Sequence, residues 1–535
     1  MKLKHLAVSL MSVAMISGGA YGLYHQQQQE TLKNYQGTYE CHPDKIYDPA
    51  SIEEVQSIVR TAAAEGRTIM TGNRKFASQI DAACADEGQI QITLKNMNHI
   101  VHFDRDAKQV TVEAGLRFND LNEFLREQKL AVNMVTELGT FTIGGMLGSG
   151  THGSSLIRHN MLADYITEMK IIDGLGNLRV LTGEQLNAAR VNLGVLGVVV
   201  EVTIQLEDAF KVAAHVYGKR DDSNLENDIL TIARNNYSTN IAWFPGIGRY
   251  TVTTYHELPL ETGGNAFNAQ AEVSDLEETL FKWLFDALHE VPGSGLQCLA
   301  ARVRYSRRDS SYYRDLDTKR IQSNPVGHSD QMQYFGCKDP DSCIWDRLPI
   351  ALQEVAIPID ELPNWIRDVK QVLEQHPRTC FPLNGIYFRF GKASNSYLGM
   401  NAGRDTAYLG IEYTLRQEGN AVPKNYFVNL EIEQMSLRKY GARPHWGKNS
   451  VAIFEDMPSR FPKWDQFMAF KQEMDPNNVF TNDFWRRASG ETPLSNYMTA
   501  GCNMRGECYC ENDSHCEEGT QCSAGKYFSD AKICR

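Results

Sequence analysis

The stretch Leu138–Ser155, LGTFTIGGMLGSGTHGSS, is the most distinctive part of this chain. Six glycines lie between Gly139 and Gly153, and no Lys, Arg, Asp or Glu interrupts them. So little side-chain bulk lets a ligand approach the backbone closely, and backbone N–H groups can bind an anion without a fixed cation. A flexible Gly/Ser loop has a similar composition. Because the stretch contains His152 and lies between well-patterned segments, we interpret it as a wall that holds a diphosphate and a flat ring.

The segments around this wall alternate between helix and strand patterns. Ser51 and Glu54 form a capping box before a helix of apolar residues spaced from Ile52 to Ala62, which Gly66 ends. Phe118, Leu121 and Leu125 mark a second helix. Strand patterns occur at Thr68–Thr71, Gln91–Leu94, Gln109–Glu113, Glu168–Ile172, Leu178–Leu181 and Val198–Ile204. The mixture predicts an α+β domain, and since no GxGxxG opens a helix after an early strand, a Rossmann domain is excluded.

The chain begins with a targeting pattern. Lys2 and Lys4 precede an apolar core, Leu6–Ile16, and the small residues 17–20 offer a cleavage site. We expect a signal peptide over 1–22 and a polar linker over 23–40. The apolar core is too short to span a bilayer, so a retained membrane anchor is the weaker alternative. No later stretch is long and apolar enough for a membrane helix, and we expect an exported protein with no membrane span.

Length and charge limit the possible partners. The 535 residues can bury more than one core, and two large domains are expected. The formal net charge is −12, and no basic block of five or more residues occurs. This balance argues against nucleic acid or an anionic membrane surface as a partner.

The 12 cysteines fall into two groups. Six are spread over the main body, and six crowd the C-terminal tail: Cys41, Cys84, Cys298, Cys337, Cys343, Cys380; Cys502, Cys508, Cys510, Cys516, Cys522, Cys534. With an export signal, an even count and no CxxC…HxxxH pattern, disulfides are favoured over zinc, and no metal site is expected. The tail is too small to enclose a core, so it depends on bridges whose pairing stays open. Its role, whether stability or surface attachment, also stays open.

Several motifs in the same order resemble a known group of flavoproteins. Asn73-Arg-Lys-Phe-Ala-Ser, the wall, and the segment Leu186–Gly197 resemble the FAD-binding half of the vanillyl-alcohol-oxidase flavoproteins. Asn384-Gly-Ile-Tyr-Phe-Arg and Pro444-His-Trp-Gly-Lys-Asn are similar to motifs of the aldonolactone oxidases within that group. The signal and the cysteine-rich tail resemble the plant-type L-gulonolactone members. The resemblance covers nearly the whole mature chain.

This resemblance implies a fold and a cofactor. The expected architecture is α+β: a two-subdomain FAD-binding domain of the vanillyl-alcohol-oxidase type over 41–210, an α+β substrate domain over 211–489 and a small disulfide-rich C-terminal module over 490–535. FAD is the implied cofactor. The residues implied to contact it are Thr71, Asn73, Arg74, Ala77 and Ser78; Thr142, Gly144, Gly145, Gly148, Gly150, His152, Gly153 and Ser154; Gly197 and Val198; and His445.

Two further expectations follow from the resemblance. Many members carry a histidine joined covalently to the flavin, and Ala77 stands at that position here, so FAD should be bound noncovalently. Cys41 and Cys84 both have counterparts in the plant-type members, and we expect them to form a disulfide.

The resemblance also implies a reaction. Family members oxidise C2 of a sugar lactone by hydride transfer to flavin N5, and fixed cations suit the charge that develops. Arg389 and Lys448 match the family's arginine and lysine, although alone they would read as surface cations. Tyr387 stands where relatives such as alditol oxidases carry Glu. We expect oxidation of L-gulono-1,4-lactone to the precursor of L-ascorbate, with O2 or another electron acceptor. The alternatives are another lactone or an alditol, or a secreted binding protein without catalysis.

Overall fold

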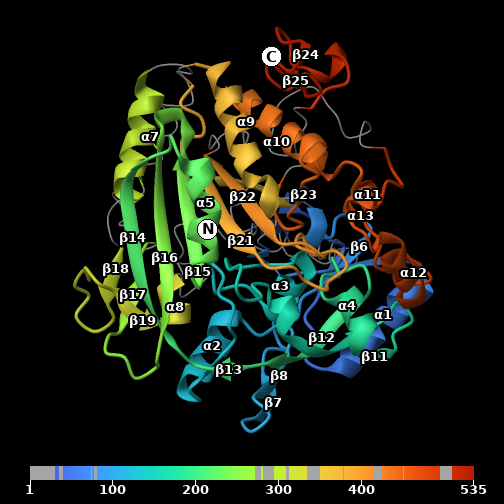
Figure 1. The fold of residues 1–535 in the computed structure, drawn as a ribbon. Coiled ribbons are helices and arrows are strands. Elements are labelled where there is room, and N and C mark those ends of the chain that lie inside the picture. The colour runs from blue at the N-terminus through green and yellow to red at the C-terminus, as the bar shows by residue number, and fades with distance from the viewer. Residues whose placement is uncertain are drawn as a thin grey trace, which may run out of the picture.

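The structure is a computed structural model that describes residues 31–34, 40–73, 75–76, 81–270, 279–280, 283, 295–308, 312–333, 350–377, 379–414, 425–449, 451–493 and 509–535. The predicted signal peptide lies outside this range, as do most of the linker and Arg74, Ala77 and Ser78. Helices and strands are mixed along the whole described chain, as Figure 1 shows.

The N-terminal part contains a small parallel sheet covered by one helix. Its strands, in spatial order, are β3 (Lys45–Tyr47), β6 (Gln89–Ile92) and β4 (Thr68–Thr71). Helix α1 (Ile52–Glu65) buries Val55, Val59 and Ala62 in the core of this unit. Ser51 Oγ accepts the Glu54 N–H at 3.2 Å, and Gly66 ends the helix with φ at +66°. The capping box and the glycine stop predicted from the sequence are confirmed.

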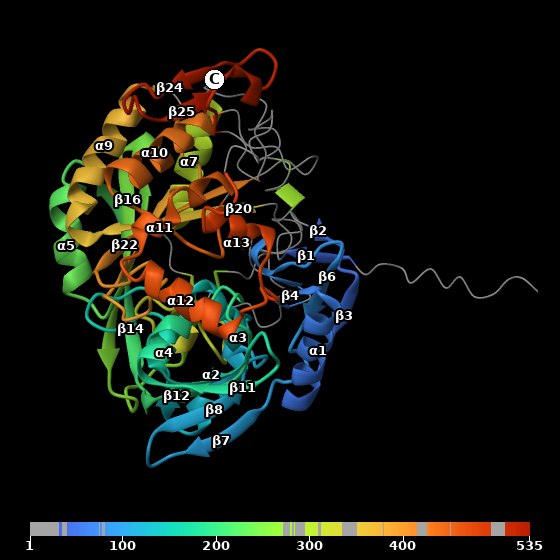
Figure 2. The ribbon, with the colours of Figure 1, turned by 90° about the vertical axis from the view of Figure 1, so that its right-hand side faces the viewer.

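A second sheet in the same half is antiparallel. Its spatial order is β11 (Leu178–Leu181), β10 (Ile166–Ile172), β12 (Val198–Gln205), β8 (Gln109–Glu113) and β7 (Ile100–Asp104). Helices α2 (Phe118–Glu127) and α4 (Gly183–Ala189) accompany it. The chain returns to this half after α12 (Trp464–Met474), where the Ile69 N–H donates to the Val479 carbonyl at 2.7 Å. Both views place α12 beside α4 (Figures 1 and 2).

The second half is built on one large antiparallel sheet of eight strands. In spatial order these are β19 (Val326–His328), β14 (Lys211–Asp221), β16 (Arg249–Leu258), β15 (Ser238–Phe244), β21 (Ile386–Gly391), β22 (Thr406–Thr414), β20 (Ile350–Pro358) and β23 (Arg443–Pro444). Two short strands, β17 (Ala266–Asn268) and β18 (Tyr313–Asp315), pair beside it.

The two faces of this sheet differ because side chains alternate along each strand. Helices α5 (Leu225–Arg234), α9 (Leu362–Glu374) and α10 (Phe427–Lys439) form a layer over one face (Figure 1). On that face Trp365 of α9 packs against Trp243 and Phe388, with ring centroids 6.4 and 6.1 Å apart. Tyr387 and Arg389, the neighbours of Phe388 on β21, therefore point to the opposite face, toward the glycine-rich stretch.

The glycine-rich stretch folds into a short helix followed by a tight turn. Thr142 caps α3 (Ile143–Ser149) by accepting the Gly145 N–H at 3.3 Å, and Gly150 ends it with φ at +69°. This helix was not predicted. Close packing also requires glycine here, because a Cβ on Gly153 would lie 2.3 Å from the Val135 carbonyl oxygen.

Four disulfides join the described cysteines: Cys41–Cys84, Cys298–Cys380, Cys510–Cys522 and Cys516–Cys534. The predicted Cys41–Cys84 pair is confirmed, and two of the tail pairings that the sequence left open are now defined. Cys337, Cys343, Cys502 and Cys508 lie outside the described residues.

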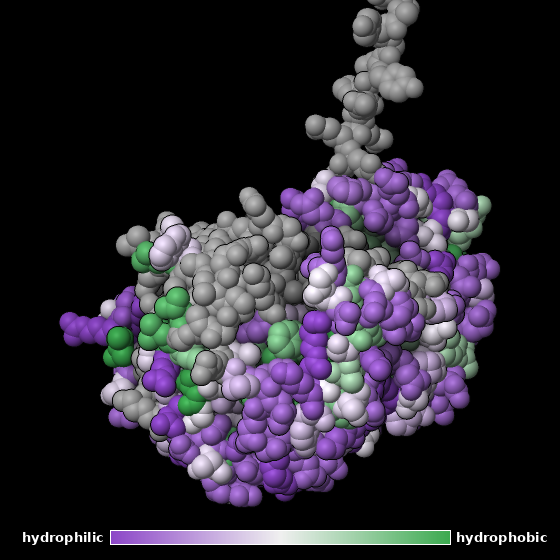
Figure 3. All heavy atoms as spheres, turned by 90° about the horizontal axis from the view of Figure 1, so that it is seen from above, coloured by the Kyte–Doolittle hydropathy of each residue, from purple (hydrophilic) through white to green (hydrophobic). Residues whose placement is uncertain are grey.

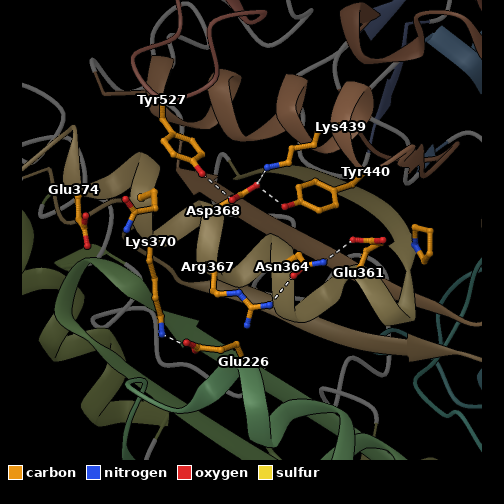
Figure 4. A pocket seen from close by; sticks show the side chains of 12 residues that line it. Glu226, Glu361, Asn364, Arg367, Asp368, Lys370, Glu374, Lys439, Tyr440 and Tyr527 are labelled. Atoms are coloured by element: carbon orange, nitrogen blue, oxygen red, sulfur yellow. Dashed lines mark hydrogen bonds and ion pairs between the residues drawn. The ribbon is translucent and has the colours of Figure 1, made fainter.

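The C-terminal module docks on the helical layer through buried polar contacts (Figure 2). Strands β24 (Cys522–Ala524) and β25 (Lys532–Cys534) form its hairpin. Glu431 of α10 accepts the backbone N–H groups of Tyr527 and Phe528 at 2.6 and 2.8 Å. The Tyr527 hydroxyl donates to Asp368 of α9 at 2.8 Å, as Figure 4 shows. The module is therefore tied to the substrate half.

Among the described residues, no helix is long and apolar enough to cross a bilayer. The described atoms on the face seen in Figure 3 are mainly hydrophilic, with hydrophobic residues scattered among them.

Glu433 of α10 carries an unusual carboxyl. One of its oxygens accepts the Tyr509 hydroxyl of the module, and the other is buried with no hydrogen-bond partner among the described residues. Burial, with help from the Glu455 charge, raises the pKa of Glu433 to about 8, against the lowering effect of Tyr509. The folded protein therefore holds a proton that the unfolded chain releases near pH 4.5.

We expect this carboxyl to destabilise the fold as pH rises from about 4.5 to about 8, because only the unfolded chain ionises freely in that window. Its contribution to the slope is at most about 1.4 kcal/mol per pH unit. Glu433→Gln should remove that contribution, which denaturant unfolding between those pH values would measure.

Glu431→Gln is the matched control. Burial raises the pKa of Glu431, but His376 and the module N–H groups lower it more, so the net shift is downward. Its stabilisation is present above its ordinary pKa and lost as pH falls, so the control should reduce stability at neutral pH. An unchanged pH dependence in Glu433→Gln would contradict the assignment.

Candidate active site

A buried carboxylate, Glu354 of β20, joins three nitrogen-bearing side chains. Its Oε1 lies 2.5 Å from His152 Nε2, and its Oε2 accepts hydrogen bonds from Arg389 and, at 3.1 Å, from Lys448 Nζ. The Glu354 side chain is only 2% exposed. The structure thus brings together both predicted catalytic cations and the predicted wall histidine. We call these four residues the Glu354 cluster.

The strand order explains how Glu354 reaches Arg389. Strand β22 lies between β20 and β21, and there Gly410 is paired with both Glu354 and Tyr387. A Cβ on Gly410 would lie 3.3 Å from Glu354 Oε2. Because glycine has no side chain, the carboxylate can cross above β22 to a residue two strands away.

A rigid turn holds Lys448. Trp446 is almost fully buried, and its ring N–H donates to the Leu398 carbonyl at 2.7 Å. The Asn449 amide bridges the turn to β20: it accepts the Glu354 backbone N–H at 2.7 Å and donates to the Glu354 carbonyl at 3.0 Å. A Cβ on Gly447 would lie 3.0 Å from Ser149 Cβ, so the turn also contacts α3.

The charges of the cluster do not cancel. Burial alone raises the pKa of Glu354, but Arg389, Lys448 and His152 together hold it well below its usual range. The pKa of Arg389 is lowered by burial but raised, on balance, by Glu137 and Glu354. Within the cluster two cations face one carboxylate, and Glu137, 3.7 Å from Arg389 at the edge of the pocket, offsets the second positive charge. Cations that are already held in place stabilise an anion that develops next to them.

His152 is enclosed between the two halves. Its side chain is 1% exposed, its ring stacks on Tyr408 with centroids 3.7 Å apart, and Nδ1 lies 2.9 Å from the Gly153 carbonyl. Burial lowers the pKa of His152 more than Glu354 raises it, so the neutral ring is favoured. A neutral ring donates through one nitrogen, and the carboxylate is the stronger acceptor. We place the proton on Nε2, where it holds Glu354 in position.

His445 completes a group of possible metal ligands. Ligand atoms of His152, Glu354 and His445 lie within 4.8 Å of one another. However, Arg389 and Lys448 already occupy the carboxylate and would repel a further cation. The His445 Nδ1 accepts the Gly447 N–H at 2.9 Å, and its ring is kept neutral because burial and Lys448 lower its pKa. The donor set therefore fits a positioning role better than a metal site.

The predicted cofactor residues converge on α3. The Leu193 N–H donates to the Gly148 carbonyl at 3.1 Å, and a Cβ on Gly194 would lie 2.9 Å from Thr71 Oγ1. The segment before Gly197 and Val198 thus adjoins both Thr71 and the glycine-rich stretch. Asn73 follows Thr71 on the same loop. Contact of these residues with FAD stays a prediction.

The N–H groups of the stretch are used differently from our expectation. The Gly144 N–H donates to the Ala114 carbonyl at 2.7 Å, and the Gly153 N–H donates to the Asn160 carbonyl at 2.7 Å. These donors hold the stretch against the protein. The Ser154 hydroxyl likewise donates to the Thr239 carbonyl.

The surroundings of α3 nevertheless fit a bound cofactor. The Thr140 hydroxyl is buried without a hydrogen-bond partner among the described residues, as expected of a group that awaits a ligand. A Cβ on Gly148 would meet no atom within 4 Å, so the helix leaves open space on that side. FAD, when bound, would supply the hydride acceptor.

A polar pocket opens beside Arg389 on the same face of the large sheet. Tyr387 lines it, and the Tyr387 hydroxyl donates to the Asn384 carbonyl at 3.1 Å. Glu137, just before the glycine-rich stretch, lines it as well and lies 3.7 Å from Arg389. The pocket therefore touches both halves of the molecule.

A second pocket, of about 840 Å³, lies on the helical side of the sheet (Figure 4). Its charged residues pair with one another, as Lys370 does with Glu226 and Lys439 with Asp368. It lies on the side of the sheet away from Arg389, and we do not assign the reaction to it.

Sequence reasoning missed Glu354. The residue lies in the motif Gln353-Glu-Val-Ala-Ile-Pro, which reads as an ordinary strand. A single carboxylate within an otherwise apolar buried strand was the available signal, because such a charge must find partners.

Comparisons with known proteins first establish the class. A family model described as "FAD binding domain" matches residues 43–182. Two solved cholesterol oxidase structures share the fold: a solvent-stable cholesterol oxidase (TM-score 0.66, 15% identity, 86% of this chain and 97% of that chain) and one from B. sterolicum (0.67, 15%, 86% and 96%). The chain is an FAD-dependent oxidoreductase that acts on CH–OH groups.

The family is identified by a model that matches the second half of the molecule, which contains the large sheet. A model described as "D-arabinono-1,4-lactone oxidase" matches residues 202–488, more than half of the chain, and the protein belongs to this family. A model described as "L-gulonolactone oxidase 2-like, C-terminal domain" matches residues 499–535. Similar relatives are L-gulonolactone oxidase 5 of Arabidopsis thaliana (28% identity, 92% of this chain, 89% of that protein) and L-gulonolactone oxidase of Scyliorhinus torazame (27%, 85%, 97%).

The Glu354 cluster predicts a large effect on stability. Glu354→Gln keeps the shape but leaves Arg389 and Lys448 without their carboxylate, so we expect the free energy of unfolding to fall by about 3–5 kcal/mol. Denaturant unfolding measures this loss. Glu473→Gln, which breaks the exposed pair with Arg179, is the control and should cost less than about 1 kcal/mol. Equal losses in both variants would refute the buried pairing.

Proposed function

We propose that this protein oxidises the C2 hydroxyl of an aldono-1,4-lactone, with L-gulono-1,4-lactone as the expected substrate. The product is the 2-keto lactone, which tautomerises to L-ascorbate. The observation that carries the proposal is the Glu354 cluster, in which a buried carboxylate holds Arg389 and Lys448 in place facing the glycine-rich half of the molecule. Family membership and this intact cluster favour an enzyme over a binding protein without catalysis.

Arg389 and Lys448 are proposed to act on the substrate oxygen. The C2 hydride would pass to FAD when it is bound, while the C2 hydroxyl releases its proton to solvent, so negative charge develops on the C2 oxygen of the lactone as the carbonyl forms. Both cations are held by Glu354, so they need not reorganise when that charge forms. Arg389 lies at the pocket and orients the lactone, while Lys448 is more exposed, at 22%, and can approach from the side of α3. His152 holds Glu354 through the other carboxylate oxygen, Oε1.

The names of the relatives support a lactone over an alditol, because L-gulonolactone oxidase recurs among them. Those names also support O2 as the electron acceptor. Noncovalent FAD follows from Ala77, which lies outside the described residues. Export is supported by the N-terminal signal pattern and by the four disulfides, which require an oxidising compartment.

The attachment of the cofactor is testable. Because alanine at position 77 cannot bond to the flavin, acid precipitation of the purified protein should release all yellow colour into the supernatant. Flavin that stays in the pellet would show covalent attachment through another residue.

The reaction itself is tested by anaerobic mixing with L-gulono-1,4-lactone, which should bleach the flavin absorbance. In Lys448→Met the fold and bound FAD should survive, but flavin reduction should slow by roughly 10²–10³-fold, as for loss of one preorganised charge. Arg389→Met should behave similarly, with weaker lactone binding as well.

Lys463→Met is the matched control, since this lysine pairs with Glu184 on the surface. It should reduce flavin at the wild-type rate. If Lys448→Met matches that rate too, Lys448 is a surface cation and the catalytic role rests on Arg389 alone.

A further inference from the structure

One polar atom in the pocket beside Arg389 has no partner. Asn240 of β15 lines this pocket, and its Oδ1 is buried without a hydrogen bond among the described residues. An unpaired buried amide oxygen destabilises the fold that holds it, because it has lost its hydrogen bonds to water. Such an atom in a pocket points to a ligand that donates a hydrogen bond to it.

The position of Asn240 relates it to the reaction site. In the β15–β21 pairing, Ala242 lies opposite Tyr387. Asn240 lies two residues before Ala242, and Arg389 lies two residues after Tyr387. Because the two strands are antiparallel, both residues lie on the same side of this pair, and both side chains lie on the same face of the sheet. Asn240 also lies opposite Thr253 of β16. The pocket therefore extends from Arg389 across neighbouring strands, away from Glu354.

Two buried tyrosines line the pocket together with Asn240, and their hydroxyls, on Tyr255 and Tyr313, lie 2.9 Å apart. Burial raises the pKa of both tyrosines, so they stay neutral. Neither hydroxyl donates to the Asn240 amide oxygen, which has no hydrogen-bond partner among the described residues and is left for a ligand.

The chemistry of the lining defines that ligand. Among the described lining residues only Arg389 and Glu137 are charged, and most of the others carry a hydroxyl or an amide, with a few apolar side chains among them. The pocket has a volume of about 70 Å³, room for a few water-sized groups. These properties suit a short, neutral, hydroxylated chain rather than a phosphate or an apolar tail.

We propose that this pocket is the subsite for the hydroxylated tail on C4 of the lactone, and that Asn240 is a specificity residue whose Oδ1 accepts a hydrogen bond from a tail hydroxyl. The proposal rests on the proposed function, because it requires the lactone ring to lie at Arg389. It assigns substrate selection to β15 and β16, apart from the Glu354 cluster. Asn240 should therefore affect which lactone reacts, and the chemistry of C2 should be independent of it.

The test compares two lactones on the FAD-loaded protein. L-gulono-1,4-lactone carries a two-carbon hydroxylated tail, whereas erythrono-1,4-lactone has the same ring without tail carbons. Anaerobic stopped-flow gives the second-order rate constant of flavin reduction for each. The wild type should prefer the tailed lactone. Asn240→Leu and Asn240→Ala should lower its rate constant by roughly 10–100-fold and leave the tailless lactone within about threefold of wild type.

Flavin content and melting temperature show whether each variant is folded. Two substitutions of different size are used so that the test can still be made if one variant does not fold. Equal losses on both lactones, or no loss on the tailed one, would overturn the subsite while the proposed function stands. A wild-type protein whose flavin is reduced by neither lactone would overturn the proposed function and the subsite with it. Binding of the nonreactive 2-deoxy analogue of the tailed lactone, followed by flavin absorbance, should weaken by the same factor in both variants.

Discussion

The buried carboxylate of Glu354 is the constraint on which the rest of the site depends. An isolated carboxylate in a protein interior costs several kcal/mol, so its surroundings must supply charge and hydrogen bonds. Here they come from three separate parts of the chain: His152 after α3, Arg389 on β21 and Lys448 in the turn before Asn449. The same ion cluster therefore fixes the two cations to which we assign catalysis and holds the glycine-rich half against the large sheet. Stability and the proposed catalysis share one set of contacts.

Much of the fold was predictable because it follows from local patterns. The capping box of α1, its glycine stop and the strands of the first half appear where spacing and turn residues indicated. The Cys41–Cys84 disulfide was expected from resemblance to related chains, not from the residues alone. Arg389 and Lys448 were likewise chosen by resemblance, since each cation by itself has the pattern of a surface residue.

The parts that escaped prediction depend on contacts between distant segments. Glu354 becomes a centre only when β22 places Gly410 between it and Arg389, and no local pattern reveals that order. The short helix α3 was missed because glycine disfavours helices, yet the Thr142 cap and close packing against the protein outweigh this preference here. The expected role of Gly144 and Gly153 as free N–H donors also depended on partners that sequence does not show.

The alternation of side chains along β15 and β21 has a consequence for how this protein can diverge. The rings of Trp243 and Phe388 pack against Trp365 of α9, whereas the alternate positions on the same strands, Ala242 and Tyr387, line the pocket on the other face. A substitution at a pocket-facing position leaves the packing of its sequence neighbours under α9 nearly unchanged. Single substitutions on these strands can therefore change substrate preference with little loss in the free energy of unfolding, so no stabilising mutation is needed first.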